Sequence, residues 1–233
     1  MIVSRTQPTG YESLKRAYGR FRARRMELFL RLVGPLPKPV KVLDVGGTAD
    51  FWQGYITDEL SVTLLNVFDQ RPLVGGMRVI VGDGCDLTQF HDRSFEVVLA
   101  HSVLGHVGGW HRQQQMASEI RRVGSRYFVQ SPNHRFPVDW RTLVPFFHWL
   151  SPAHQAWCLQ KVRVGRYARV PDADRAHHLA NRIRNVTRSE LRELFPGGTI
   201  VVERVCGFPK SFVVHQGFDR RSESVGQRIT RHR

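Results

Sequence analysis

The chain has 233 residues, which is enough to bury the core of one large domain. Hydrophobic residues make up 41% of it and charged residues 24%, proportions typical of a globular protein and not of a disordered or fibrous one. No apolar run is long enough to span a bilayer, and the first residues lack the apolar stretch of a secretory signal. We therefore expect neither a transmembrane helix nor a secretory leader.

The formal net charge is +15, and the surplus of positive over negative residues lies in the two end segments of the chain. Residues 1–34 carry 8 Lys and Arg against 2 Asp and Glu, and residues 134–233 carry 18 against 8. Residues 35–133 are close to neutral, with 9 against 10. Two explanations of this surplus are open. The flanks are simply solvated, or they bind an anionic substrate, a membrane surface or a nucleic acid.

The chain contains three cysteines, Cys85, Cys158 and Cys206, at wide and irregular spacing. That spacing matches neither a metal-ligand motif nor a disulfide framework. We therefore predict no metal site, and we expect a reducing, cytoplasmic location.

The first 133 residues predict one helix followed by a repeating strand and helix pattern. A basic helix over 11–33 ends at Gly34-Pro35. Short apolar runs then predict five strands, at 40–45, 61–66, 78–81, 95–100 and 126–130. Helical stretches follow the first strand, from about 49 to 60, and the fourth, over 110–123. Strands that alternate with helices predict βαβ units and a parallel sheet.

The last hundred residues have a different character. Thr187 precedes Glu190 by three residues, which predicts a capping box at the start of a helix ending at Leu194. Runs at 199–205 and 212–215 predict two strands that pair antiparallel. The predicted organisation is therefore a basic helix at 1–34, a domain at 35–218 with a cap insertion at 134–186, and a disordered basic tail at 219–233.

Residues that follow the strands are the candidates for ligand binding, because parallel sheets bind ligands at the carboxyl ends of their strands. Gly46 and Gly47 follow the first strand and allow close approach of backbone to ligand. This turn does not match G-x-G-x-x-G, which argues against a dinucleotide. Asn66 ends the second strand, where nucleoside-binding folds place a group facing the ribose. Asp83 follows the third strand and is able to accept a hydrogen bond from an exocyclic amine.

The succession VLDVGG, VTLLNV, VGDGCDL, DRSFEVVLAHSVLGHV and EIRRVGSRYFVQSPN is similar to the class I S-adenosylmethionine-dependent methyltransferases of the small-molecule type. The resemblance covers about 39–133, together with the closing helix and hairpin at 187–216. It implies a doubly wound, mostly parallel seven-stranded α/β sheet of Rossmann-like type, with an antiparallel last strand and a helical cap insertion. It also implies an enzyme whose cofactor is S-adenosyl-L-methionine.

The resemblance implies cofactor-binding roles for ten residues near the strand ends. Those expected at the methionine end of the cofactor are Asp44, Gly46, Gly47, Thr48, His101 and Ser102. Those expected at the ribose and adenine are Asn66, Asp83, Gly84 and Cys85. The chain departs from the family at two points: its glycine turn is shorter, and Asn66 stands where a carboxylate is usual. Asp69 is the alternative partner for the ribose.

A sulfonium methyl group is already activated, so such an enzyme mainly aligns the acceptor and excludes water. A hydroxyl acceptor also gains from a general base. The candidate catalytic residues are His106, His134 and Asp139, with His101 as a further candidate for the base.

The strand-four segment AHSV lacks the Asn/Asp-Pro-Pro-Tyr/Phe string of enzymes that methylate base amines, and no Pro-Cys nucleophile is present there. We therefore predict O-methylation of a small molecule such as a sugar, a lipid-linked glycan or a secondary metabolite. The basic cap, with Arg163, Arg166 and Arg169, predicts an acceptor that is anionic or rich in hydroxyls. An RNA methyltransferase and a non-catalytic binding protein that keeps the cofactor fold are the alternatives.

Overall fold

The computed structural model describes residues 9–70 and 77–218, with side chains from residue 19 onward. The chain divides into two compact units, Met1–Pro37 and Lys38–Arg233. The first unit contains α1 (Thr9–Val33), the basic helix that the sequence predicts. The predicted tail at 219–233 lies outside the described residues. None of the described helices is both long and apolar enough to cross a membrane.

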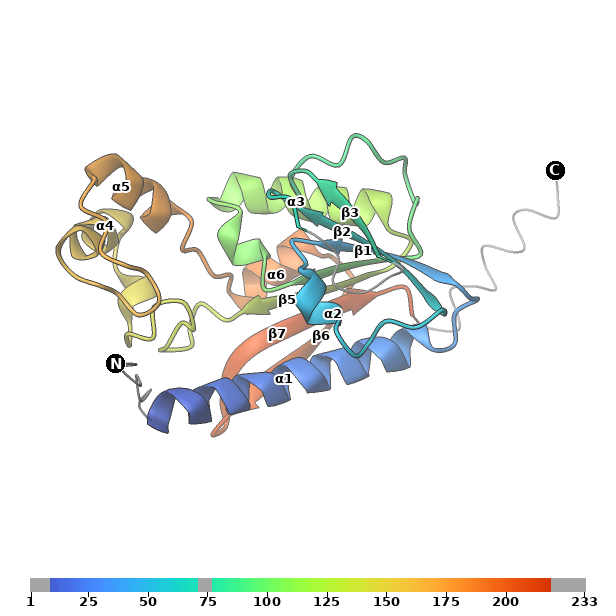
Figure 1. Cartoon of the computed structure of the whole chain (residues 1–233), viewed down its shortest axis with the longest axis horizontal. Helices are drawn as coiled ribbons and strands as arrows, with labels where there is room; N and C mark the ends of the chain where they lie inside the picture. Colours follow the sequence, from blue (N-terminus) through green and yellow to red (C-terminus); the bar gives the residue numbers. More distant parts are fainter. Residues whose placement is uncertain (1–8, 71–76, 219–233) are drawn as a thin grey trace, which may run out of the picture. The chain divides into compact units, whose positions relative to one another are not determined.

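The second unit is built on a seven-stranded sheet with the order β3-β2-β1-β4-β5-β7-β6 (Figure 1). Five strands run parallel: β1 (Val40–Val45), β2 (Leu60–Asn66), β3 (Met77–Val81), β4 (Val97–His101) and β5 (Tyr127–Pro132). A hairpin of β6 (Thr199–Val205) and β7 (Phe208–Gln216) completes the sheet, with β7 antiparallel to both β5 and β6. The predicted doubly wound, mostly parallel sheet is confirmed.

The hairpin is tighter than the sequence predicts. Cys206 and Gly207 have φ angles of 47° and 82°, so a two-residue turn joins Val205 directly to Phe208. Positive φ at both central positions matches the twist of paired strands. Strand β7 therefore begins four residues earlier than the predicted start at Phe212.

The prediction of a helix from about 49 to 60 is wrong in the length of the helix. The structure has only the short helix α2 (Ala49–Trp52) there, and turns occupy most of the following residues. Gly54 has a φ of 83°, a left-handed conformation that ends a helix at little cost for glycine. The short helix still buries Phe51 and Trp52.

Two helices of this unit pack on the sheet through one apolar cluster. They are α3 (Trp110–Val123), which has the predicted bounds, and α6 (Arg188–Leu194), whose predicted capping box between Thr187 and Glu190 is confirmed. Met116 and Ile120 lie one helical turn apart on α3 and are fully buried in this cluster. The packing places the start of α3 beside the carboxyl ends of the strands (Figure 1).

The insertion between β5 and α6 contains η2 (Phe147–Trp149), α4 (Pro152–Lys161) and α5 (Ala173–Asn181). Ser151 caps α4 and Asp172 caps α5, each accepting a hydrogen bond from a backbone N–H of the first turn. The two helices share a small core of their own, which includes Leu159 and Ala176. The cap is therefore a separately packed layer that projects beyond the sheet (Figure 1).

Candidate functional site

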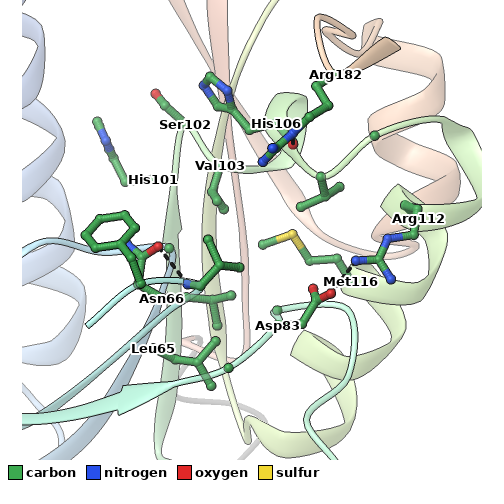
Figure 2. A pocket seen from close by; sticks show the side chains of 18 of the residues that line it. Leu65, Asn66, Asp83, His101, Ser102, Val103, His106, Arg112, Met116 and Arg182 are labelled. Atoms are coloured by element: carbon green, nitrogen blue, oxygen red, sulfur yellow. Dashed lines mark hydrogen bonds and ion pairs between the residues drawn. The ribbon is translucent and has the colours of Figure 1, made fainter. Parts of the chain in front are cut away.

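A cavity of about 750 Å³ lies at the carboxyl ends of β1, β2, β3 and β4. Strands β1 and β4 are neighbours at the centre of the sheet, where the strand order changes direction. Ligands of open α/β sheets bind at this switch point. The segment after β4, the start of α3 and the end of α5 supply the remaining wall (Figure 2).

The structure brings seven of the ten predicted cofactor residues to this cavity. They are Gly46, Thr48, Asn66, Asp83, Gly84, His101 and Ser102. The other three, Asp44, Gly47 and Cys85, are buried and are not part of the cavity wall. These three residues form contacts within the turns that carry the lining residues.

Asp44 is fully buried beside the glycine turn. Its Oδ2 accepts a hydrogen bond of 2.8 Å from the indole N–H of Trp52, and its Oδ1 has no hydrogen-bond partner in the part of the chain that the structure describes. Burial raises the pKa of this carboxyl to about 7, against the opposing effect of the Trp52 hydrogen bond. A Cβ atom on Gly47 would lie 2.0 Å from Asp44 Oδ2, so this carboxyl needs glycine at position 47.

Gly46 is required for a different reason. Its φ is 75°, and a Cβ atom there would lie 2.2 Å from Cγ2 of Val103. Its place after the first strand predicts close approach of a ligand to this glycine. In the structure the protein's own packing already demands it, because Val103 fills the space above the turn.

Asn66 holds the glycine turn from the neighbouring strand. Its Nδ2 donates to the carbonyl oxygen of Gly47 at 3.0 Å, and its Oδ1 accepts from the backbone N–H of Val67 at 2.9 Å. Gln70 Nε2 donates to the same carbonyl at 2.9 Å. A carboxylate has no donor for this carbonyl, which explains the amide at position 66. Asp69, the alternative ribose partner, does not line the cavity.

Asp83 faces the cavity from the end of β3 and is paired with Arg112 of α3 (Figure 2). Its Oδ1 also accepts a hydrogen bond of 2.9 Å from the backbone N–H of Cys85. Burial tends to raise the pKa of Asp83, but the hydrogen bonds from Cys85 and Arg112 outweigh it and lower the pKa. Asp83 is therefore a fixed, ionised acceptor. Arg112 is a cavity residue that was not predicted from the sequence, where its only signal is its place at the start of the helix after β4.

The wall between these polar groups is apolar. Val67 and Phe68, directly after β2, line the cavity and are 64% and 52% exposed. Leu65 and Met116 continue the same surface deeper in the cavity (Figure 2). Exposed apolar surface flanked by a few fixed polar groups fits a flat heterocycle joined to a sugar.

The end of β4 supplies the opposite wall. His101 packs against Phe51 with ring centroids 4.8 Å apart and the ring planes tilted by 35°. Ser102 has a φ of 58°, which a non-glycine residue adopts at a cost of about 1–3 kcal/mol. Its N–H donates to the carbonyl of Gln130 at 3.0 Å, and its hydroxyl donates to the Gln130 side chain. The strained backbone is thus held by β5 with Ser102 at the cavity.

Of the three predicted catalytic residues, only His106 lines the cavity. It ends the short helix η1 (Leu104–His106) after β4. Burial, and after it the charge of Arg141, lower the pKa of His106 to about 4. The imidazole is therefore neutral at physiological pH. Arg141 Nη1 and Arg182 Nε hold this segment by donating to the carbonyls of Gly105 and His106, at 2.9 and 3.1 Å.

His134 and Asp139 lie in the cap, away from the cavity wall. The carbonyl of His134 accepts hydrogen bonds from His148 and Trp149, and its ring packs edge-on against His148. Asp139 is 3% exposed and accepts hydrogen bonds from Arg141 and Asn185. Burial tends to raise its pKa, but these partners lower it to about 2. Asp139 therefore orders the cap through Arg141.

The cap contributes His178, Asn181 and Arg182 to the cavity wall. None of them carried a recognisable signal, because they come from an insertion whose packing the sequence does not reveal. The cavity wall does not include the three cap arginines that were predicted to bind the acceptor, Arg163, Arg166 and Arg169. Within residues 9–70 and 77–218, no group of three or more His, Cys, Asp or Glu side chains is arranged to hold a metal ion.

Comparison with known proteins supports one fold and one kind of domain. Residues 55–126 match the family model of a methyltransferase domain. The comparison with curated protein sequences gave no match. Among solved structures, the 1,6-didemethyltoxoflavin N1-methyltransferase from Burkholderia thailandensis, with bound 1,6-didemethyltoxoflavin and S-adenosylhomocysteine, is 15% identical, with a TM-score of 0.50 and 92% of each chain covered.

Two further solved structures are similar at lower TM-scores. A methyltransferase dependent on S-adenosylmethionine (SAM) from Aquifex aeolicus is 12% identical, with a TM-score of 0.47 and coverage of 82% of this chain and 87% of that one. A SAM-dependent methyltransferase from Methanosarcina mazei is 17% identical, with a TM-score of 0.47 and coverage of 77% and 92%.

Proposed function

Because this chain carries a class I S-adenosylmethionine-dependent methyltransferase domain, with S-adenosylmethionine as its cofactor, we propose that it methylates an oxygen atom of a small molecule. The observation that carries this proposal is His106, a neutral imidazole in the wall of the strand-end cavity. A hydroxyl acceptor needs a group that takes its proton. No comparable need exists for an amine that is already deprotonated.

The cavity residues divide between the two ends of the cofactor. Asn66 and Asp83 would hold the ribose and the adenine amine, with Val67 and Phe68 covering the rings. Gly46, Thr48 and Ser102 would face the methionine part. Asp44, Gly47 and Cys85 would act indirectly, because they shape the turns beneath these residues. When bound, S-adenosylmethionine supplies an activated methyl group.

His106 would act on the acceptor. A neutral imidazole nitrogen accepts a hydrogen bond from the acceptor hydroxyl and takes its proton as the oxygen is methylated. Arg141 and Arg182 fix the position of the η1 segment and leave the imidazole ring to the cavity. The low pKa keeps His106 neutral at every pH well above 4, and it also makes the imidazole a weak base. His106 would therefore take the proton only as the forming bond to the methyl group makes the acceptor oxygen acidic.

The charge of the cavity favours an acceptor with an anionic group. The single carboxylate in its wall, Asp83, is already paired with Arg112. His178 of α5 and Arg182, the residue after α5, also line the cavity, and Asp83 is the one acidic residue among the described residues of the wall. An anionic group on the acceptor would therefore be placed beside Arg182, at the end of α5.

Transfer of a deuterated methyl group from labelled cofactor, followed by mass spectrometry, tests the proposal. The substrates are small hydroxy acids, matched amines and single-stranded RNA, and we expect labelled ethers. His106→Gln should lower kcat by about 10²-fold, the lower end of the usual contribution of a general base because a group of low pKa is a weak base, with little change in the Kd of S-adenosylhomocysteine. Wild-type activity should show no inflection near pH 6.5.

His111→Gln is the matched control, since His111 lies exposed on α3 and does not line the cavity. It should leave turnover unchanged. Full turnover of an ether-forming reaction by His106→Gln would remove His106 as the base. Labelled RNA or labelled amines in place of ethers would replace the proposed acceptor class.

A further inference from the structure

A second hollow, of about 370 Å³, shares no lining residue with the methyl-transfer cavity. It forms where the chain leaves β5, where α6 begins, and along the β6–β7 hairpin (Figure 1). Asn133 follows β5, Thr187 caps α6, and Phe212 belongs to β7. The site is therefore assembled from three segments that are far apart in the sequence.

Positive charge dominates its wall. Three of the nine lining residues are arginines, Arg135, Arg188 and Arg204, and none is acidic. Among the described residues, the guanidinium groups of Arg135 and Arg188 make no hydrogen bond or ion pair with another side chain or with the backbone. Arg204 donates to the carbonyl of Gly207 at 2.9 Å. Like charges gathered without a counter-charge attract an anion.

Two carboxylates on the same segments, Glu190 of α6 and Glu203 of β6, are bound to other groups. Glu190 accepts a hydrogen bond of 2.7 Å from the backbone N–H of Thr187 and is paired with Arg184. Glu203 accepts a hydrogen bond from the hydroxyl of Ser211. Both carboxylates are thus engaged with other partners, and neither lines the hollow.

The rest of the wall defines the kind of anion. The Thr187 hydroxyl already donates to Glu190 within the capping box, so the hydroxyl of Ser189, 3.0 Å from it, is the donor left at this side. Val202 and Pro209 supply apolar surface, and buried Phe212 lies beneath it. A bare ion would use only the arginines and the Ser189 hydroxyl, whereas an anion on a carbon framework would also cover the apolar part.

We propose that this hollow binds the phosphate group of an organic phosphate monoester, with the carbon part of the ligand on Val202 and Pro209. Guanidinium groups pair with phosphate through two parallel N–H donors, and a monoester presents three free oxygens and up to two negative charges. The site is separate from the methyl-transfer cavity, so its occupancy does not depend on the proposed function.

Calorimetry with phenyl phosphate on the full chain tests this site. Phenyl phosphate should bind at millimolar concentration or below, and phenol should not. Arg188→Gln should weaken binding by about 10- to 100-fold, the usual effect of losing hydrogen bonds to a charged group. Arg192→Gln is the matched control, because Arg192 is exposed one turn later on α6 and does not line the hollow. It should bind as the wild type does.

Saturation with S-adenosylhomocysteine should leave the affinity for phenyl phosphate unchanged, since the two cavities share no residue. Vesicles of phosphatidic acid distinguish the source of the phosphate. Binding to vesicles that phenyl phosphate reverses assigns a lipid headgroup, and binding of phenyl phosphate without vesicle binding assigns a free metabolite.

Three outcomes would overturn the proposal. The first is no detectable binding of phenyl phosphate, and the second is equal affinity in Arg188→Gln and Arg192→Gln. The third is binding of single-stranded RNA, but not of phenyl phosphate, that is lost in Arg188→Gln. That last result would make the hollow part of a nucleic-acid surface instead.

Discussion

The side-chain amide of Asn66 donates a 3.0 Å hydrogen bond to the carbonyl oxygen of Gly47, so the end of β2 holds the glycine turn that follows β1. The same side chain accepts from the N–H of Val67, which leaves it in one orientation at the cavity. The departure from the usual carboxylate thus has a structural cause. This chain uses position 66 to stabilise its shortened turn.

Asn66→Asp should therefore destabilise the protein, although it restores the residue type usual in the family. The new carboxylate would face the Gly47 carbonyl without a proton to donate, a loss of about 1–3 kcal/mol in the free energy of unfolding. Chemical denaturation at pH 8 measures this. Asp69→Asn, an opposite change at an exposed neighbouring position, should have almost no effect. An Asn66→Asp variant as stable as the wild type would show that the hydrogen bond contributes little.

Gly46→Ala should also destabilise the protein, by about 1–3 kcal/mol or more, because its φ of 75° is unfavourable and its new Cβ would overlap Val103. Val103→Ala removes the overlap but not the backbone strain. The double variant should thus lose less free energy of unfolding than the sum of the losses in the two single variants. Strict additivity would mean that Val103 is not the obstacle.

Asp44 makes the stability of the protein depend on pH. Its pKa in the folded chain is about 7, above its ordinary value of 3.8, so between these values the folded state keeps a proton that the unfolded state has lost. Stability from this group therefore falls as the pH rises from about 4 to 7, by up to about 4 kcal/mol. Asn at this position has no proton to lose.

The stability of Asp44→Asn relative to the wild type should consequently increase between pH 5 and pH 8, and level off above that range. Thermal melts of both proteins across this range measure the difference. Asp50→Asn, at a neighbouring exposed carboxylate, is the control and should show no such trend. A difference that does not vary with pH would mean that Asp44 is ionised throughout.

Arg141 joins the cap to the segment that carries His106. It donates to both oxygens of buried Asp139, to Asn185 and to the carbonyl of Gly105. Arg141→Ala would leave Asp139 buried without its counter-charge, at a cost of about 3–5 kcal/mol in the free energy of unfolding. Arg141→Lys should recover little of this, because a single ammonium cannot replace the planar guanidinium.

Turnover should fall in Arg141→Lys even where the protein stays folded, since η1 loses its support at Gly105. The Kd of S-adenosylhomocysteine should change much less. Arg166→Ala is the control, because Arg166 lies over the Trp140 ring, 5.2 Å from its centroid, and does not line the cavity. Equal losses of stability in Arg141→Ala and Arg166→Ala would contradict the role given to Arg141.

The sequence by itself determined most strands and helices of the sheet domain, because the patterns that predict them are local. Apolar runs such as Val40–Val45 and the helix Trp110–Val123 are visible as continuous or periodic patterns, and the structure has the same bounds. The capping box of Thr187 and Glu190 is also a local pattern. Residues at strand ends, such as Gly46 and Asp83, could be assigned to one edge because parallel strands bring their carboxyl ends together.

Only the tertiary structure decided what those residues touch. The contact of Gly46 with Val103 and the pairing of Asp83 with Arg112 join segments that nothing in the local sequence relates. The cap was the hardest part, since its helices pack on each other and its position over the cavity depends on buried polar contacts. That is why Arg182 of the insertion reaches the cavity, whereas Asp139 is turned inward to Arg141.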